Sequence, residues 1–555
     1  MKLRRTLLFG LAVALGGAAA AAAVGSGSSG LTNVASANPK VQGLSQPNIL
    51  SPELAEVVVA QGSLKLDGGT SDVPTYGYDG NGPFVPTSFN GLAATEAQKT
   101  EPDKNTYLVL PGQHGADPGY DYGSHFLYQG HEATEAGVGA AITRVNLDAD
   151  GAHRVTLLAT QTQAGKPLHA IDGSTWDPWA HRLLFTTESN QTGTPPTPTP
   201  SVYQATPDYP SKVDDISNVV GRGGFEGVQN DDKGNVYLVE DIGGATGTGA
   251  NARTKQPGSF IYRFLPNDPS DLTKGGKVQA LQVTVNGSPL VFSSTPDADI
   301  NAPGYVALHQ YGTTWPTKWL TIQTTTSSTP LPGADDNALA KAAGATPFKR
   351  PENGQFRPGT HFTEFWFDET GDTDNRTCAG GGTSLLPACT SPKVSGGYGS
   401  IFKLDQSPTS DTGKISIFYN ADADHSGFDN VAFFGRDQIA FVQDAGDTQH
   451  AQQNELDSAF MFDTTVDYSN PANKPVRFLA EGRDPSATLD SELTGTGNEG
   501  DNEITGLHVS DGDPSPQGIL GARIPNPFRT ARWRVFWTQQ HGDNTTWEVI
   551  PAPKG

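Results

Sequence analysis

The sequence predicts an all-β fold, a β-propeller of about five to six blades with inserted loops and a few short helices. Short apolar or β-branched runs alternate with turns rich in Gly and Pro, of which the chain has 65 and 41. Long amphipathic helical patterns are scarce, and only residues 335–345 are expected to be helical. A hairpin unit with acidic residues at its ends also recurs, as radially repeated blades would require.

The clearest unit spans residues 224–241, GFEGVQNDDKGNVYLVED. It opens on Glu226, turns at residues 231–235, continues as the apolar strand 236–239 and closes on Glu240 and Asp241. Gly and Asn in the turn favour a hairpin, because they tolerate positive φ. The unit can therefore pack along its apolar body while its acids point to one place.

Four other stretches repeat this pattern, at residues 171–190, 347–368, 428–444 and 502–541. Their acids are Asp172 and Glu188, Glu352, Asp429 and Asp444, and Glu503, and the last unit ends on His541. A propeller places one end of every inner strand at a common axis. Two β-sandwiches would show similar strands but would give no reason for the recurring acids.

Further strands are expected outside the turns of these units, and several of them form pairs. Their expected positions are 105–110, 122–132, 141–148, 154–159, 183–185, 259–265, 278–285, 291–294, 362–367, 400–404, 414–419, 438–442 and 534–538.

Acidic residues outnumber basic ones by 60 to 37, which gives a formal net charge of -23. This charge argues against nucleic acid or an anionic membrane as partner, because both attract cationic proteins. Two readings stay open: simple solubility, or carboxylates gathered to bind hard cations, with Ca²⁺ first.

The recurring acids form the candidate metal-ligand set. Carboxylates close together raise one another's pKa, and bound Ca²⁺, with or without a transition metal, would relieve that repulsion. Acids that merely solubilise strand ends are the simpler alternative for any single residue. Arg350, two residues before Glu352, could bind a phosphate group with two hydrogen bonds, or could form a surface ion pair.

The N-terminus has the features of an export signal, with basic Lys2, Arg4 and Arg5 before the apolar run 7–15. The Arg4-Arg5 pair fits a twin-arginine signal as well as the general route. We expect a cleavable signal over residues 1–30, a flexible tether over 31–48 and one propeller domain over 49–555, with a low-complexity insertion near 192–201. The protein is then secreted or extracytoplasmic, and no later apolar run could span a membrane.

Cys378 and Cys389, the only two cysteines, lie in one Gly-rich loop. In an oxidising compartment we expect them to form a local disulfide. No His or third Cys lies at the spacing of a metal site.

Five segments in this order, DGSTWDPWAHRLLFTTE, FEGVQNDDKGNVYLVED, FKRPE, FDNVAF and NEITGLHVSDGD…FWTQQHGD, resemble those of the PhoX-type secreted alkaline phosphatases. The resemblance covers the chain from about residue 105 to the end. It implies a propeller that holds Ca²⁺ and iron on its axis and hydrolyses small phosphate esters without a protein nucleophile. It also implies phosphate contact by Arg350, a catalytic role for Glu352, and metal ligands at Glu188, Glu226, Glu240 or Asp241, Glu352, Asp444 and Glu503.

The chain departs from the family pattern at one informative position. Thr187 stands where the family has a Cys that bridges two iron ions, and Ser189 stands where a second acid is expected. The chain therefore resembles a divergent member, in which Ca²⁺ is expected and iron or another transition metal is an open question.

Three functions follow as hypotheses. The first is a secreted, monomeric, metal-dependent phosphatase acting on small phosphate esters. The second is a non-catalytic, Ca²⁺-stabilised propeller that binds a glycan, peptide or surface polymer. The third is a Ca²⁺-dependent, lactonase-like hydrolase.

Overall fold

The structure is a computed structural model that describes residues 29–40, 46–78, 100–133, 140–188, 200–326, 335–372, 395–483, 503–541 and 543–553. Residues 1–28 of the expected export signal, most of the expected low-complexity insertion and both cysteines lie outside these residues. The predicted disulfide is therefore not described. In the described part of the chain, no helix combines the length and the apolar character needed to cross a membrane.

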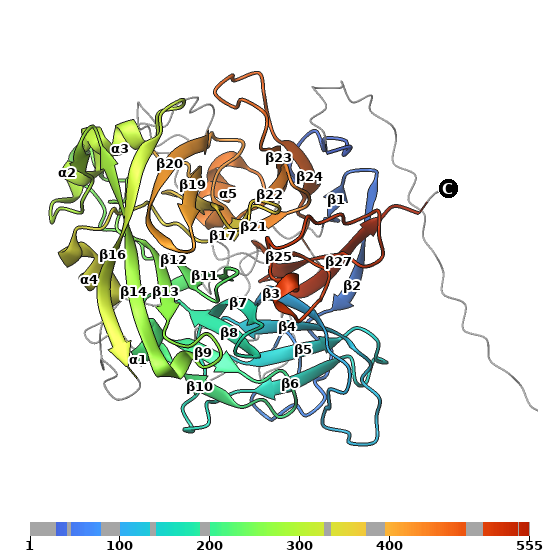
Figure 1. The fold of residues 1–555 in the computed structure, drawn as a ribbon. Coiled ribbons are helices and arrows are strands. Elements are labelled where there is room, and N and C mark those ends of the chain that lie inside the picture. Colours follow the sequence, from blue (N-terminus) through green and yellow to red (C-terminus); the bar gives the residue numbers. More distant parts are fainter. Residues whose placement is uncertain are drawn as a thin grey trace, which may run out of the picture.

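The strands form a ring of antiparallel sheets around a central axis, which confirms the predicted propeller (Figure 1). Five sheets are present, and the ten-stranded sheet contains two blades, so the described ring has six blades. Blade 1 consists of β3 (Pro102–Val109), β4 (His125–His131), β5 (Ile142–Asn146) and β6 (Val155–Ala159). Blade 2 consists of β7 (Ile171–Asp177), β8 (Arg182–Thr187), β9 (Val202–Ala205) and β10 (Val213–Asp215).

Blades 3 and 4 share the ten-stranded sheet. Blade 3 consists of β11 (Phe225–Asn230), β12 (Val236–Glu240), β13 (Ile261–Pro266) and β14 (Gly275–Val285), which also pairs with β15 (Ser288–Pro289). Blade 4 consists of β17 (Gly354–Phe356), β18 (Glu364–Glu369), β19 (Ser400–Ser407) and β20 (Ser410–Asn420). The long strand β16 (Trp315–Thr326) pairs with both β14 and β20 and so joins the outer edges of the two blades.

Blades 5 and 6 each take their outermost strand from the N-terminal part of the chain. Blade 5 consists of β21 (Phe428–Phe433), β22 (Gln438–Gln443), β23 (Ser458–Asp463), β24 (Val476–Ala480) and β1 (Ile49–Leu50). Blade 6 consists of β25 (Glu503–Ser510), β26 (Arg534–Gln540), β27 (Thr545–Pro551) and β2 (Leu54–Ala60). Because β2 is hydrogen-bonded to β27, strands from the N-terminal and C-terminal parts of the chain meet in one blade.

The inner strands complete the ring. Each of them contacts the inner strand of the next blade, and β25 of blade 6 contacts β3 of blade 1. Apolar side chains fill the space between blades, as where Trp537 of blade 6 and Val442 of blade 5 belong to one buried cluster. This packing holds the six inner strands at fixed positions around the axis.

Helices are short and lie in the connections. They are α1 (Ser217–Val220), α2 (Pro296–Ile300), α3 (Pro303–Leu308), α4 (Asp336–Ala343) and α5 (Gly446–Gln453), with 3₁₀ turns η1 (Gly249–Asn251), η2 (Leu272–Lys274) and η4 (Pro516–Gly518). The predicted helix at 335–345 is confirmed as α4. The Asp335 side chain accepts a hydrogen bond from the Ala338 N–H at its start, and Gly344 ends it with a positive φ.

Most predicted strands are present within a few residues of their expected ends, but the prediction at 291–294 is wrong. Those residues form a loop before α2. Strands β1, β2, β9, β10, β15, β16, β23, β24 and β27 were not predicted, and all of them lie outside the five repeating units.

The described part of the segment expected to be a flexible tether lies against blade 5. The Val34 N–H donates to the Arg477 carbonyl, and the Asn38 side chain donates to the carbonyls of Ala480 and Glu481. Asn38 is 5% exposed. These contacts hold residues 29–40 on the blade, because a buried amide must keep its hydrogen bonds.

The turn before β21 contains a carboxylate that should make stability depend on pH. Asp422 accepts hydrogen bonds from His425 Nδ1 and from Lys474 Nζ, each at 2.6 Å. Burial alone would raise the pKa of Asp422, but these two partners lower it from 3.8 to about 2. An acid with a lowered pKa stabilises the fold fully above its unfolded-state pKa and loses this effect as the pH falls toward 2.

We therefore expect Asp422→Asn to lower the free energy of unfolding by about 1 to 2 kcal/mol at pH 6. The difference from the unmodified protein should shrink between pH 4 and pH 2. Urea unfolding at several pH values measures it, with Asp424→Asn, at an exposed position of the same turn, as the control. A difference that does not change with pH would show that Asp422 does not act through its charge.

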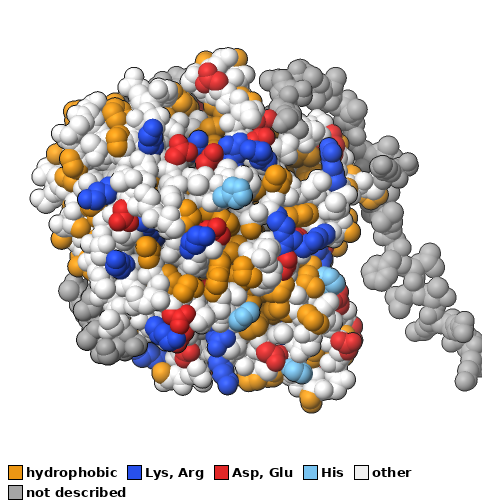
Figure 2. Space-filling model, viewed as in Figure 1, with side chains coloured by type: hydrophobic (Ala, Val, Ile, Leu, Met, Phe, Trp, Pro, Cys, Tyr) orange, Lys and Arg blue, Asp and Glu red, His pale blue; other side chains and the backbone are white. Residues whose placement is uncertain are grey.

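The face of the molecule seen in Figure 1 is hydrophobic near its centre, with charged side chains scattered around (Figure 2). No group of acidic side chains gathers at the centre of this face. The recurring acids must therefore lie deeper in the ring or open to another face.

Candidate metal and phosphate-binding site

In each blade, the inner strand begins beside the residue at which the second strand ends, because the two strands are antiparallel. In blade 3, Phe225 at the start of β11 pairs with Glu240 at the end of β12. The next residue on each side is an acid, Glu226 on the inner strand and Asp241 after the second strand. We call the first of these positions the entry position and the second the exit position.

One backbone hydrogen bond repeats at this end of five blades. The N–H of the exit residue donates to the carbonyl of the residue two places before the entry residue. The donor–acceptor pairs are Glu132 with Glu101, Glu188 with Ala170, Asp241 with Gly224, Thr370 with Arg350, and Asp444 with Gly427, at 2.7 to 3.1 Å. The five blades therefore present their entry and exit side chains in the same way.

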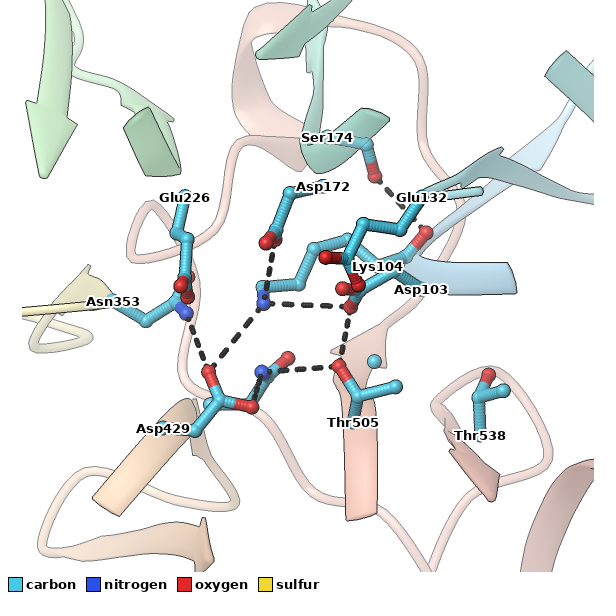
Figure 3. A network of polar contacts seen from close by, with 12 residues as sticks. Asp103, Lys104, Glu132, Asp172, Ser174, Glu226, Asn353, Asp429, Thr505 and Thr538 are labelled. Carbon is cyan, nitrogen blue, oxygen red and sulfur yellow. Dashed lines mark hydrogen bonds and ion pairs between the residues drawn. The ribbon is translucent and has the colours of Figure 1, made fainter. Parts of the chain in front are cut away.

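The entry residues of blades 1 to 5 are all acidic: Asp103, Asp172, Glu226, Glu352 and Asp429. In blades 1, 2, 3 and 5 the strand register shifts just at this residue, which indicates a β-bulge. A bulge turns a side chain out of the regular alternation of the strand. Figure 3 shows the side chains of Asp103, Asp172, Glu226 and Asp429 pointing toward one another from different blades.

The entry and exit acids form three overlapping groups that could each hold a metal ion. They are Asp103 with Glu132 and Asp172, Asp172 with Glu188 and Glu226, and Glu226 with Asp241 and Glu352. Within each group, the candidate ligand oxygens all lie within 4.8 Å of one another. The predicted ligands Glu188, Glu226, Asp241 and Glu352 are thus brought together by the fold.

The electrostatics of these groups favour bound cations. Burial, together with the carboxylates of Asp172 and Glu352, raises the pKa of Glu226 well above its usual range. Burial likewise raises the pKa of Glu132, and nearby Glu188 raises it further. Without cations such a cluster must take up protons, so divalent ions are a natural way to keep it ionised.

Arg350 lies at the edge of the third group. Its Nε and Nη2 atoms donate to Asp241 at 2.8 to 3.2 Å, and Nη2 also donates to Glu352 at 3.0 Å. Burial would lower the pKa of Arg350, but the carboxylates of Asp241 and Glu352 raise it well above its usual value. Its backbone has a φ of 51°, uncommon for a residue with a side chain, so local packing holds Arg350 in this place.

A family model of the alkaline phosphatase PhoX matches residues 214–510. This match spans more than half of the 555 residues. The chain belongs to the PhoX alkaline phosphatase family. A search of curated proteins found no significant match.

Solved structures give weaker likenesses. Pseudomonas fluorescens PhoX, solved with vanadate as a transition-state analogue, is 13% identical, with a TM-score of 0.49 over 94% of this chain and 98% of that chain. Chaetomium thermophilum Sqt1 is 11% identical, with a TM-score of 0.30 over 82% and 95%. A putative 6-phosphogluconolactonase from Bacteroides fragilis is 9% identical, with a TM-score of 0.26 over 79% and 91%. Because all three scores are below 0.5, the propeller assignment here rests on the strand topology.

Blade 6 does not have an acid at its entry position, unlike the other five blades of this PhoX-family propeller. Glu503 pairs directly with Gln540, the last residue of β26, and the register shift of this blade comes only later, between Thr505 and His508. Glu503 therefore lies before the bulge rather than at it, and it joins none of the three groups among the described residues. It contacts His541 Nε2 at 3.3 Å, while His541 Nδ1 faces Glu101 at 3.2 Å. Both nitrogens of His541 thus face carboxylates rather than an open ligand position.

Asp444 lies beside the groups without joining them. Its charge helps to raise the pKa of Asp429, to about 7, after burial and Asp103, and it also helps to raise the pKa of Glu352 and Glu503. Asp444 therefore adds to the negative potential that the other carboxylates of the site create.

The predicted ligand Glu240 points away from the ring. Its carboxylate accepts hydrogen bonds from the Phe260 N–H, the Tyr262 hydroxyl and the Asn337 side chain, at 2.9 to 3.0 Å. Burial raises its pKa to about 8. Glu240 is the last residue of β12, one place before the exit position, and side chains alternate along a strand. Of the two neighbouring acids, Asp241 faces the ring.

Thr187 occupies the corresponding place at the end of β8. Its side chain is fully buried, and its hydroxyl accepts a hydrogen bond from the Ser201 N–H at 2.8 Å. The side chain at this position thus holds the connection to β9.

Sequence reasoning missed the contribution of blade 1. Asp103 and Glu132 occupy its entry and exit positions, and Lys104 follows Asp103. The same signal was present, since an acid precedes the strand at 105–110 and another ends the stretch 122–132. Residues 110–124 form a long connection between these strands instead of a short turn, so the repeat was not recognised.

Proposed function

We propose that this PhoX-family protein is a secreted, metal-dependent phosphatase that hydrolyses small phosphate esters at the axis of the propeller. One observation supports this most strongly. Glu188, Glu226, Asp241 and Glu352, which come from blades 2, 3 and 4, lie in overlapping groups with Arg350 at their edge. Carboxylates that hold cations beside a guanidinium form the charge pattern needed to bind a phosphate dianion.

The donor set fits hard cations. All side chains in the three groups offer carboxylate oxygens, which Ca²⁺ prefers, and none offers sulfur or nitrogen. Glu132, Glu188, Glu226, Asp241 and Glu352 would hold the ions, which when bound supply positive charge to polarise a phosphoryl oxygen. With Thr187 in place of the bridging Cys, we propose Ca²⁺ rather than a thiolate-bridged iron pair.

Arg350 is the residue that would bind the phosphate group. Its Nε and Nη2 atoms are held by Asp241 and Glu352, whereas its Nη1 atom makes no hydrogen bond within the described part of the chain. The two N–H groups on Nη1 can therefore donate to phosphate oxygens while the rest of the guanidinium stays fixed. Such positioning before the substrate arrives lowers the cost of stabilising the transition-state charge.

Turnover of p-nitrophenyl phosphate by the purified protein tests this function. We expect activity that disappears after treatment with a chelator and returns when Ca²⁺ is added, with Fe³⁺ as a separate arm. If no metal supports turnover but the chelator still unfolds the protein, the Ca²⁺-stabilised binding module is the better description. Turnover of lactones alone would select the lactonase-like hydrolase.

The proposed ions should also stabilise the fold. A ligand at about 100 times its Kd stabilises the native state by about 2.7 kcal/mol per site. We therefore expect a lower melting temperature in a chelator, restored by Ca²⁺ and little affected by Na⁺ at the same ionic strength. Differential scanning calorimetry measures this, and an unchanged melting temperature would argue against ion binding by the buried carboxylates.

A further inference from the structure

Lys104 places a positive charge among the entry and exit acids, which together we call the carboxylate ring. Its Nζ atom lies 3.2 Å from Asp172, 3.5 Å from Asp103 and 3.6 Å from Asp429 (Figure 3). The residue is 8% exposed. One ammonium group thus contacts the entry acids of blades 1, 2 and 5, much as a bound metal ion would.

The surroundings of Lys104 divide the ring into two parts. Asp429 is fixed by the side chains of Asn353, at 3.0 Å, and Asn430, and the Thr505 hydroxyl donates to Asp103. These donors and Lys104 supply hydrogen bonds and charge to this part of the ring.

The other part of the ring has less compensation from the protein. Among the described residues, no Lys, Arg or His nitrogen lies within 4 Å of Glu188 or Glu226, and Arg350 contacts only Asp241 and Glu352. Glu132, Glu188 and Glu226 thus form no ion pair within the described residues, and an external cation would supply the missing charge.

We propose that the ammonium group of Lys104 takes the place of one bound cation in the ring. It neutralises the point between Asp103, Asp172 and Asp429, so that divalent ions bind only on the side of Glu132, Glu188, Glu226, Asp241 and Glu352. An ammonium and a divalent ion would repel each other and compete for the same oxygens, so the two do not share this point. Lys104 thereby sets how many ions the ring holds. This inference rests on the proposed metal centre.

Replacing the charge tests the inference. Lys104→Met keeps a long, unbranched side chain but leaves the three aspartates without their cation. We expect this variant to bind one more divalent ion per chain than the unmodified protein, measured by elemental mass spectrometry after dialysis against Ca²⁺ and by titration calorimetry. The same number of ions in both proteins would overturn the inference.

Lys349→Met is the matched control, because Lys349 is also buried and contacts Asp372, a carboxylate that belongs to none of the three groups, at 3.3 Å. Its ion count should equal that of the unmodified protein, and a gain of one ion there as well would overturn the special role of Lys104.

A second variant decides the matter if Lys104→Met does not fold. In Asp429→Asn, the ion count should stay unchanged, because Asp429 is a partner of Lys104 and not a metal ligand. Loss of an ion in Asp429→Asn would overturn the inference. An unmodified protein that binds no ion at all would overturn both this inference and the proposed metal-dependent function, whereas the other failures concern Lys104 alone.

Discussion

Glu352→Gln should lower kcat/KM for p-nitrophenyl phosphate by at least about 100-fold. Glu352 contributes to the third carboxylate group and also accepts a hydrogen bond from Arg350 at 3.0 Å, so the change weakens both ion binding and the position of the guanidinium. Even residues that only support metal ligands typically cost 10- to 100-fold when changed. The measurement is steady-state kinetics at saturating Ca²⁺, with ion content determined on the same sample.

Glu364→Gln is a suitable control for this experiment. Glu364 lies at the start of β18 in the same blade, at the end of that strand opposite the candidate metal ligands. It contacts Arg357 at 3.0 Å. We expect near-normal kinetics for this variant. If Glu352→Gln also turned over substrate at the normal rate with its full ion content, Glu352 would have to be removed from the proposed site.

Arg350→Ala should lower kcat by about 10² to 10³-fold, the usual cost of removing a donor that stabilises transition-state charge. Arg350→Lys should recover little of this loss. Lys keeps the charge but cannot hold two carboxylates and still offer two N–H groups to phosphate. The two variants should retain bound ions, since Arg350 is not a ligand, and this separates phosphate binding from metal binding.

Arg357→Lys provides the comparison for Arg350. Arg357 also contacts two carboxylates, Glu364 and Asp437, but it does so at the opposite end of blade 4. Its change should leave kcat unaffected. A loss of bound ions in Arg350→Ala would show that the guanidinium mainly supports the ligands, and its assignment to phosphate would then be wrong.

The sequence predicts the propeller and much of the candidate site because one local rule operates in each blade. An acid before an inner strand and another after the second strand must lie side by side in any antiparallel hairpin, as Glu226 and Asp241 do. The sequence alone does not show that the hairpins share one axis. The contacts between neighbouring inner strands confirm that they do.

Other features depend on details that a sequence pattern does not contain. Glu240 and Asp241 are adjacent acids, and only the strand alternation shows which of them faces the ring. Glu503 fits the pattern in sequence, but the register shift between β25 and β26 lies further along the strand, so Glu503 is not at the bulge. Lys104 was missed because its acidic partners Asp172 and Asp429 come from other blades, and the sequence next to Lys104 does not indicate them.

The closure of the ring by β2 has a consequence for biosynthesis. Blade 6 needs residues 54–60 together with strands that end at residue 551, so it cannot form until nearly the whole described chain has left the ribosome. Strand β2 is synthesised long before its partner β27, and every other blade is made between the two. A chain that has emerged through residue 551 is the shortest that can assemble blade 6 and close the ring.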